Sequence, residues 1–192
     1  MSFYSHVELK TLGLGCFGHG VMISKKCSIY GAERIFIGNN VRIDDFCVLS
    51  AGTDGIKIGS FVHIAVFSSL IGRGSIEVAD FANISSRVSI YSSNDDYSGE
   101  HMTNPMIPDE YKGVVHRPVQ IGRHAIIGSG SIVLPGVCVR EGVAVGALSL
   151  VNSDCDAFGV YAGVPAIRKS ERKRDLLVLE RQFLASHADG AK

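Results

Sequence analysis

Aliphatic residues recur at every sixth position along most of the chain. The series is unbroken over one long stretch: Ile121, Ile127, Val133, Val139, Val145 and Val151. Shorter runs with the same period lie upstream: Ile37, Ile43 and Leu49; Ile58, Ile64 and Leu70; Val78, Ile84 and Ile90. Six residues are not a helical period, whereas alternation over such short stretches is typical of strands that bury one face. The pattern predicts three short strands per turn, with the turns stacked into a triangular prism.

The breaks in this period all fall at one place in the turn. Extra residues occur after the third strand, at 29–37, 49–58, 70–78 and 90–121. Insertions that collect at one corner are expected of a prism whose loops leave along a single edge. The longest of them predicts a loop over residues 92–116, and loops of that length are usually functional or disordered.

The two ends of the chain lack the six-residue period. Ser5 and Glu8 form a capping-box pattern, which predicts a short N-terminal helix through Leu12. The charged segment 170–186, with interspersed leucines, predicts an amphipathic helix that lies on the prism. We therefore expect one domain with three parts: an N-terminal cap over 1–22, the solenoid over 23–157 with loop 92–116, and a C-terminal helical tail over 158–192.

Charge and cysteine content narrow the possible functions. Nineteen basic residues balance nineteen acidic ones, so no net charge attracts nucleic acid or an anionic membrane. Five cysteines without a Cys-x-x-Cys pair argue against a disulfide framework and a structural zinc site. The chain has neither a signal-peptide pattern nor an apolar run of about 18 residues, the length of a spanning helix. We expect a cytoplasmic protein without a membrane span.

Turns that carry Ile-Gly pairs, such as Ile121-Gly122 and Ile127-Gly128, resemble those of the hexapeptide-repeat acyltransferases. Residues 118–137, and Tyr-Ala-Gly-Val-Pro-Ala at 161–166, are similar to the acetyl-CoA-binding part of the galactoside and maltose acetyltransferases. The loop from residue 92 is similar to that of O-acetyltransferases from lipopolysaccharide and capsule gene clusters. The resemblance implies an all-β fold, a left-handed parallel β-helix, with acetyl-CoA as acyl donor and no metal. It also implies a homotrimer with active sites between subunits.

The candidate base departs from the resembled pattern. The galactoside group carries a catalytic histidine in the loop after the third strand, and counting turn positions puts Asp95 in that slot. His63 is our first candidate, because histidine takes a proton near neutral pH with little tuning. Asp95 and Asp96 are the alternatives, as base, partner of the base or sugar ligands, although a carboxylate base needs a raised pKa. An ordinary surface histidine and a solvated turn would equally account for these residues.

Further polar residues are expected to contact the two substrates. Arg42 and Asn83 flank His63 in one outward column, and with Tyr97 and His124 they form the candidate acceptor-binding set. For acetyl-CoA, the resemblance implies a groove of small residues, with basic side chains for the phosphates. The candidates are Ser129, Ala147, Asn152, Ser153, Arg168 and Lys169, with Arg172 near them. Close packing of the turns would by itself also select the small residues.

Acetyl-CoA-dependent O-acetylation of a sugar, in lipopolysaccharide, O-antigen or capsule biosynthesis, is the expected function. One alternative is N-acetylation of a nucleotide-linked amino sugar, since an amine can lose its proton late and depends less on a dedicated base. Another is a metal enzyme resembling γ-class carbonic anhydrases, for which His116 and His124 have no matched third histidine. A non-catalytic scaffold is disfavoured by the segment that resembles a CoA site.

Overall fold

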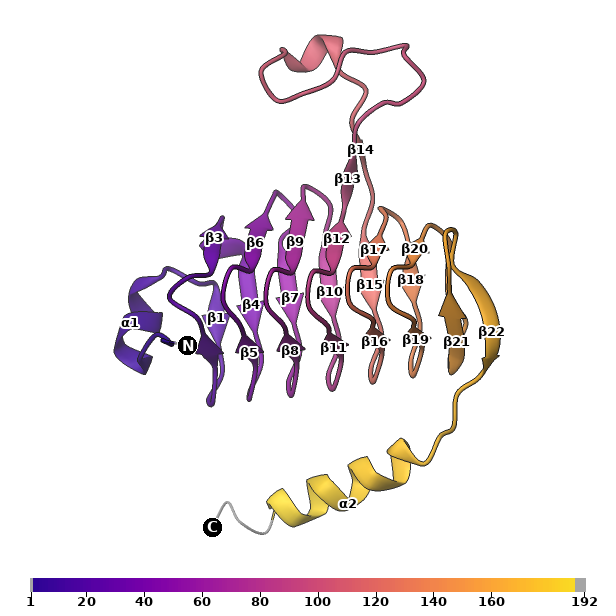
Figure 1. Ribbon diagram of the computed structural model, residues 1–192. Helices are drawn as coiled ribbons and strands as arrows, with labels where there is room; N and C mark the ends of the chain where they lie inside the picture. The colour runs from indigo at the N-terminus through magenta and orange to yellow at the C-terminus, as the bar shows by residue number, and fades with distance from the viewer. Residues whose placement is uncertain (1, 189–192) are drawn as a thin grey trace.

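A computed structural model describes residues 2–188 and is a parallel β-helix with three flat faces (Figure 1). The first sheet contains, in order, β1 (Cys16–Phe17), β4 (Ile35–Ile37), β7 (Ile56–Ile58), β10 (Ile76–Val78), β15 (Val119–Ile121) and β18 (Cys138–Val139). The second contains β2 (Met22–Ile23), β5 (Arg42–Ile43), β8 (His63–Ile64), β11 (Asn83–Ile84), β16 (Ile126–Ile127), β19 (Ala144–Val145), β21 (Gly159–Ala162) and β22 (Ile167–Glu171). The third contains β3 (Ser28–Tyr30), β6 (Val48–Ala51), β9 (Ser69–Gly72), β12 (Ser89–Tyr91), β17 (Ile132–Val133) and β20 (Leu150–Val151).

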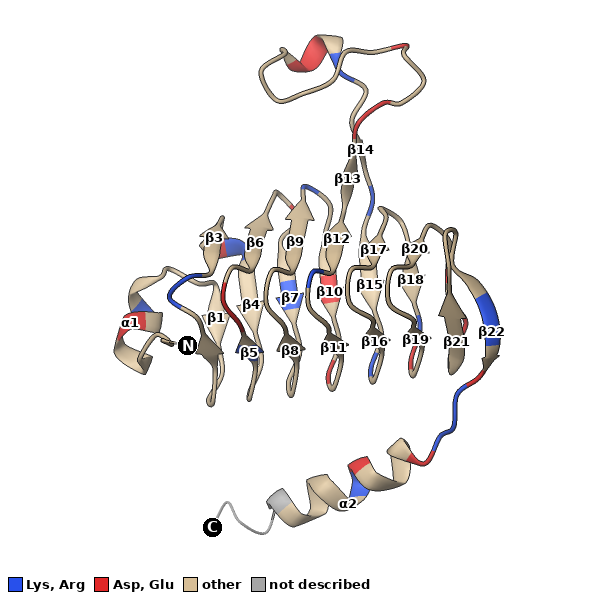
Figure 2. Cartoon of the chain, viewed as in Figure 1, with Lys and Arg blue, Asp and Glu red and all other residues tan. Residues whose placement is uncertain are grey.

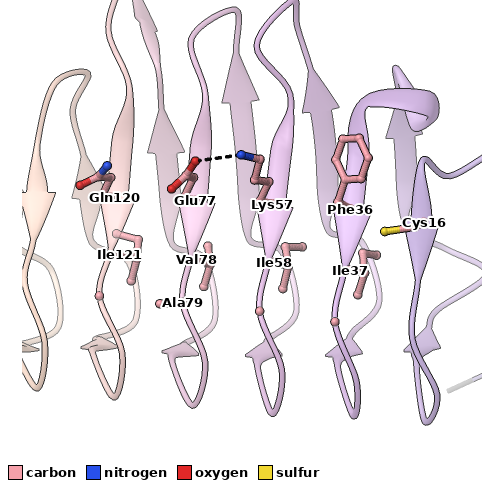
Figure 3. Close-up of a pocket in the computed structure, with 13 residues that line it drawn as sticks. Cys16, Phe36, Ile37, Lys57, Ile58, Glu77, Val78, Ala79, Gln120 and Ile121 are labelled. Carbon is pink, nitrogen blue, oxygen red and sulfur yellow. Dashed lines mark hydrogen bonds and ion pairs between the residues drawn. The ribbon is translucent and has the colours of Figure 1, made fainter.

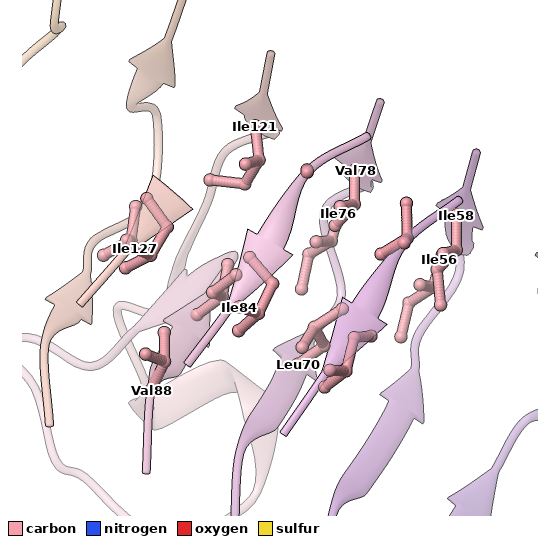
Figure 4. Close-up of a cluster of buried hydrophobic side chains, with 14 of the residues drawn as sticks. Ile56, Ile58, Leu70, Ile76, Val78, Ile84, Val88, Ile121 and Ile127 are labelled. Carbon is pink, nitrogen blue, oxygen red and sulfur yellow. The ribbon is translucent and has the colours of Figure 1, made fainter. Parts of the chain in front are cut away.

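The core is a stack of aliphatic side chains, which lie one above the other along the prism axis. Ile43, Ile64, Ile84 and Ile127 are register partners on neighbouring strands of the second sheet, and each has 0% of its surface exposed. Equivalent columns run inside the other two sheets, and Figure 4 shows the columns meeting in the centre. The six-residue period and the resulting fold are therefore confirmed.

Aromatic residues stack along the first corner, between the first and second sheets. Phe61, Phe81 and His124 have φ values of 58°, 59° and 58°, a left-handed conformation that is uncommon without glycine. Their rings stack at 4.9 Å and 5.0 Å between successive centroids. Helix α2 (Leu176–Ala188) covers this stack with Phe183, whose ring meets Phe61 edge-on at 5.2 Å. The predicted tail helix thus lies on the prism at this corner.

A long excursion leaves the third corner, between the third and first sheets. β13 (Ser93–Asn94) and β14 (Val115–His116) pair antiparallel, and the chain between them includes the 3-10 turn η2 (Asp109–Tyr111). We call residues 93–116 the arm, and Figure 1 shows it projecting from the prism. Ser92 fastens its base, since its buried hydroxyl donates to Gly74 O at 2.6 Å. The loop predicted over 92–116 is present.

The ends of the fold extend the solenoid beyond the predicted boundaries. Helix α1 (His6–Thr11) has the predicted capping box, with Ser5 Oγ accepting from Glu8 N. Strand β1 joins the first sheet ahead of residue 23, and β21 joins the second sheet after residue 157. The 3-10 turn η1 (Ala32–Arg34) fills the first break in the period. Helix α2 begins at Leu176 rather than near residue 170, because 167–171 form β22.

Removing volume from the central column should destabilise the prism strongly. Ile84→Ala should lower the free energy of unfolding by about 2–5 kcal/mol, because it leaves a cavity between stacked side chains. The same substitution at Ile167, which is 56% exposed, is the matched control and should cost far less. Urea unfolding of both variants measures the difference. Equal losses at the two positions would contradict an inward column.

Candidate active site

His63 stands in an outward row of polar side chains on the second sheet. Strand pairing sets it between Arg42 and Asn83, as the sequence predicts. The same pairing brings it beside Asp44, which follows β5. His63 Nε2 lies 2.9 Å from Asp44 Oδ2, and Arg42 Nε donates to Asp44 Oδ1 at 2.7 Å. One carboxylate therefore joins the histidine and the arginine.

Asp44 determines which ring nitrogen of His63 carries the proton. Only 6% of the Asp44 side chain is exposed, against 43% of the His63 side chain. Burial by itself would raise the pKa of the Asp44 carboxyl, but hydrogen bonds from Arg42 and His63, and their charges, hold that pKa below its ordinary value. The ionised carboxylate can only accept, so His63 donates its Nε2 proton to it. Nδ1 then carries the lone pair that is able to accept a proton.

Sequence reasoning missed Asp44, although its position carried a signal. It directly follows an inward isoleucine, where the neighbouring turns have the small residues Ser24 and Ala65. A carboxylate in that place is buried against the next turn and needs partners there. His63 on the next turn is such a partner, and Arg42, two residues before Asp44 on its own turn, is the other.

Asp95 lies at the root of the arm. A hollow of about 410 Å³ is lined there by Asp95 and Tyr97 of the arm, by Tyr91, and by the apolar Leu134 and Leu150. Tyr97 is 87% exposed. The hollow thus combines a carboxylate, two phenol rings and an apolar floor, a set suited to a small polar ligand with a hydrophobic face.

Asp96 is engaged within the arm itself. Its carboxylate accepts hydrogen bonds from the backbone N–H groups of Ser98 and His101, both at 2.9 Å. These bonds, that from Ser98 first, hold the pKa of Asp96 far below its ordinary value. A carboxylate of such low pKa is a weak base. The geometry gives Asp96 a role in shaping the arm and leaves Asp95 open to a ligand.

Ser129 and Ala147 lie exposed at the second corner, between the second and third sheets. The turns pack closely there, since a Cβ on Gly128 would lie 2.5 Å from the Ala147 backbone nitrogen. Ser129 and Ala147 carry short side chains, beside which the exposed Leu148 offers an apolar contact for a thin chain such as pantetheine. The residues present fit the cofactor that the resemblance implies.

Asn152 and Ser153 lie at the third corner, on the other side of the third sheet. A hollow of about 220 Å³ contains Asn152 together with Asn94 and Leu134. Since Asn94 and Leu134 also line the hollow at Asp95, the two hollows adjoin. The candidate cofactor residues therefore fall into two groups, and Asn152 of the second group lines a hollow that adjoins the Asp95 hollow.

The basic candidates near the C-terminal end differ in their contacts. Arg168 and Lys169 are exposed on β22, where Arg168 pairs with Glu171. Arg172 instead donates to the backbone oxygens of His124 and Gly142, at 2.8 Å and 3.0 Å. Arg168 and Lys169 remain candidates for phosphate contact, whereas Arg172 fastens the tail to the prism.

His124 lies apart from the other candidates, under α2 at the first corner. Its Nε2 is 2.6 Å from Glu180 Oε2, its ring stacks on Phe81, and 11% of its side chain is exposed. Arg123 joins the same cluster through Glu180 and Asp80. These contacts account for His124 without a ligand.

A hollow over the first sheet carries none of the predicted residues. It measures about 560 Å³ over the first sheet, where Figure 3 shows Phe36, Lys57, Glu77 and Gln120 on adjacent strands. One ion pair, Lys57–Glu77 at 3.4 Å, crosses it. Its open surface offers no group placed for acid–base chemistry beyond that pair.

The buried thiols and the grouping of possible metal ligands bear on which kinds of catalysis the protein can carry out. Burial raises the pKa of Cys27 to about 12, and those of Cys47 and Cys155 to about 11, so these three thiols stay protonated and are poor nucleophiles. Within residues 2–188, no three His, Cys, Asp or Glu side chains converge as metal ligands. None of the described helices is long and apolar enough to cross a membrane.

Known proteins resemble the chain over nearly its whole length. The dTDP-4-amino-4,6-dideoxy-D-glucose acyltransferase of Escherichia coli is 55% identical over 186 residues, 97% of each chain. The putative lipopolysaccharide biosynthesis O-acetyl transferase WbbJ of E. coli K12 is 33% identical, over 72% of this chain and 69% of its own. No protein-family model matches.

A solved structure agrees with these relatives. AntD, an N-acyltransferase from Bacillus cereus, crystallised with dTDP and 3-hydroxybutyryl-CoA, superposes with a TM-score of 0.94. It is 48% identical, over 97% of this chain and 98% of its own. The chain belongs to the hexapeptide-repeat acyltransferases.

Two pairs of positions in this acyltransferase match a spacing seen in AntD. AntD was crystallised with a serine replaced, and also with an aspartate ten residues further along replaced. Here Ser85 and Asp95 have that spacing, as do Ser86 and Asp96. Because Asp96 is engaged by the arm backbone, the first pair is the one whose carboxylate faces a hollow.

The Asp44 carboxylate should make the stability of this acyltransferase depend on pH. Because its folded pKa is lowered, the ionised form contributes stability above its unfolded pKa of about 3.9, and this is lost as pH falls through the folded value. Asp44→Asn should therefore destabilise the protein at pH 7, and the deficit should shrink toward pH 3. Urea unfolding at both pH values measures it. Exposed Asp54, replaced by Asn, is the control, and a deficit that is constant with pH would contradict the argument.

Proposed function

We propose that the chain transfers an acyl group from a coenzyme A thioester to the amino group of a dTDP-linked 4-amino-4,6-dideoxy sugar. The observation that carries the proposal is the 55% identity, over 97% of both chains, to an acyltransferase named for that substrate. AntD, solved with coenzyme A and dTDP-4-amino-4,6-dideoxyglucose, supports it. This is the N-acylation alternative. It is better supported than the sugar O-acetylation that the sequence favoured. O-acetylation is supported by the more distant relative WbbJ.

Asp95 is the proposed binding group for the acceptor amine. A sugar amine is largely protonated near neutral pH, and an ionised carboxylate attracts the ammonium and accepts its hydrogen bond. The exposed position of Asp95, in a hollow of about 410 Å³, supports this role. The aspartate replaced in AntD has a spacing from a serine that Asp95 and Asp96 both match, and of these two Asp95 is the one that lines a hollow.

His63 is the proposed base. Its Nδ1 takes a proton from the ammonium, and Asp44, at 2.9 Å from Nε2, stabilises the imidazolium that results. The neutral amine then attacks the thioester carbonyl, and the nitrogen of the tetrahedral adduct loses its remaining extra proton to solvent. The adduct collapses, and the C–S bond breaks to leave the amide and release coenzyme A as thiolate. The thiolate is reprotonated from the imidazolium. No covalent enzyme intermediate is needed.

Coenzyme A is proposed to lie along the C-terminal turns. The short side chains of Ser129 and Ala147 suit the pantetheine chain, and Arg168 and Lys169 are basic groups for its phosphates. Asn152 lines the hollow that adjoins the hollow of Asp95, and Ser153 follows it in the chain. When bound, the cofactor supplies the activated acyl group, and these residues orient it toward the amine.

A homotrimer with sites between subunits completes the proposal. His63 lies on the second sheet, and Asp95 lies beyond the far edge of the third sheet, so the width of the third sheet separates them. At about 3.3 Å per strand residue, this separation is on the order of 15 Å. One chain does not bring them to the same amine, whereas cyclic packing sets one edge of a chain against a different edge of its neighbour. The exposed arm supports the same arrangement, since Met106 and Tyr97 are each 87% exposed.

The acceptor test compares an amine with a hydroxyl. We expect acyl-CoA and dTDP-4-amino-4,6-dideoxyglucose to give an amide at least about a hundredfold faster than the matching 4-hydroxy sugar gives an ester, because an amine is the stronger nucleophile. Thiol release and NMR of the product measure both reactions. Faster ester formation would return the function to O-acetylation.

Mixing two defective chains tests the base, the amine ligand and the shared site together. His63→Ala should lower turnover by about 10²–10⁴-fold, and Asp95→Asn should mainly raise KM for the sugar. Co-expressing the two variants should restore about a quarter of wild-type activity, because each site then has an even chance of drawing each intact residue. Each variant alone is the control. No recovery, or a mass near 20.6 kDa by light scattering, would contradict the shared site.

A further inference from the structure

Another hollow, between the arm and the loop after β9, carries a cluster of cationic groups. It measures about 400 Å³ and is lined by Arg73, Lys112 and His116, with Asp109 and Val114. Arg73 comes from the loop after β9, and the other residues come from the arm. Figure 2 shows acidic and basic positions next to one another in the arm. The mechanism above uses none of these side chains.

Lys112 is unusual within this cluster because its side chain is mostly covered. Only 13% is exposed, yet its partner Asp109, at 2.7 Å, is 93% exposed on the short turn η2. Lys112, with Arg73 and His116 nearby, holds the pKa of the Asp109 carboxyl below its ordinary value. A covered ammonium is costly unless an anion neutralises it. Here the neutralising anion stands on a surface turn.

We propose that this hollow binds the diphosphate of the sugar nucleotide, and that Asp109 occupies the place of a phosphate in the free protein. The proposal rests on the proposed function for the identity of the ligand. Arg73 and Lys112 bring two positive charges to a ligand of two adjacent phosphates, and His116 adds a hydrogen-bond donor or a third charge. A diphosphate carries more charge than one carboxylate and so displaces Asp109.

The position of the hollow suits the reaction. His116 Nδ1 lies 2.7 Å from Ser93 Oγ, and Ser93 also lines the hollow of Asp95. A sugar nucleotide therefore has one continuous path, with its diphosphate at Arg73 and Lys112 and its amino sugar at Asp95. The turns proposed for coenzyme A lie on the C-terminal side of the arm, whereas Arg73 lies on the N-terminal side. The diphosphate of the acceptor fits this hollow better than the phosphates of the cofactor.

Two substitutions should change affinity in opposite directions. Lys112→Ala should weaken binding of dTDP by about tenfold or more, because a charge-assisted hydrogen bond to phosphate is lost. Asp109→Asn should strengthen it several-fold, because the competing anion is removed. Isothermal titration calorimetry with dTDP, thymidine and coenzyme A measures the effects. Thymidine and coenzyme A should bind the variants as they bind wild type.

Matched controls come from the exposed pair Lys57–Glu77. Lys57→Ala and Glu77→Gln remove the same kinds of charge from another ion pair and should leave dTDP binding unchanged. Opposite signs at Lys112 and Asp109 are not produced by a disordered arm, since both variants would then bind less. If both variants bind dTDP as wild type does, or if Lys112→Ala weakens coenzyme A instead, the diphosphate site is wrong.

The outcome also separates this proposal from the proposed function. A wild-type protein that acylates the dTDP-linked amine, but whose Lys112 and Asp109 variants bind dTDP normally, overturns the diphosphate site alone. A protein that does not acylate the amine, but binds inorganic pyrophosphate with the two opposite shifts, retains the anion site and overturns the proposed function alone.

Discussion

Parallel strands stack about 4.8 Å apart and close three to a turn. The narrow interior that they enclose is filled by tightly stacked aliphatic side chains, and this packing constraint orders the rest of the protein. Ile64 and Ile84 meet it with no exposed surface. Because each turn repeats the one below, a residue's place within its turn determines which way its side chain faces. A change of register by one residue would turn every buried isoleucine outward.

The same stacking brings together side chains that are about twenty residues apart in the chain. Arg42, His63 and Asn83 become neighbours because they hold the same place in successive turns. Asp44 takes a place that usually holds a small residue, and its burial forces it to recruit the two basic groups beside it. Which ring nitrogen of His63 carries its proton thus depends on the stacking of the turns.

The arm adds the chemistry that a plain prism lacks. A uniform stack presents shallow faces, such as the hollow over the first sheet with its single ion pair. The arm leaves the third corner and creates further hollows, among them one lined by Asp95 and one lined by Lys112. Carboxylate on one side and cations on the other suit an acceptor with an amine at one end and a diphosphate at the other.

Sequence alone predicts the prism, its capping helix and the exit of the arm, because a period of six and its breaks are local properties of the chain. It also placed Arg42, His63 and Asn83 in one column, since turn positions can be counted. Three features become visible only in the folded protein. They are the contact of Asp44 with His63, the hydrogen bonds that hold Asp96 within the arm, and the covering of His124 by α2. Each depends on a contact between segments whose separation no period specifies. For the same reason the sequence alone did not determine whether the acceptor group is an amine or a hydroxyl. The prism is compatible with both, and the choice depends on how the arm and the turns meet.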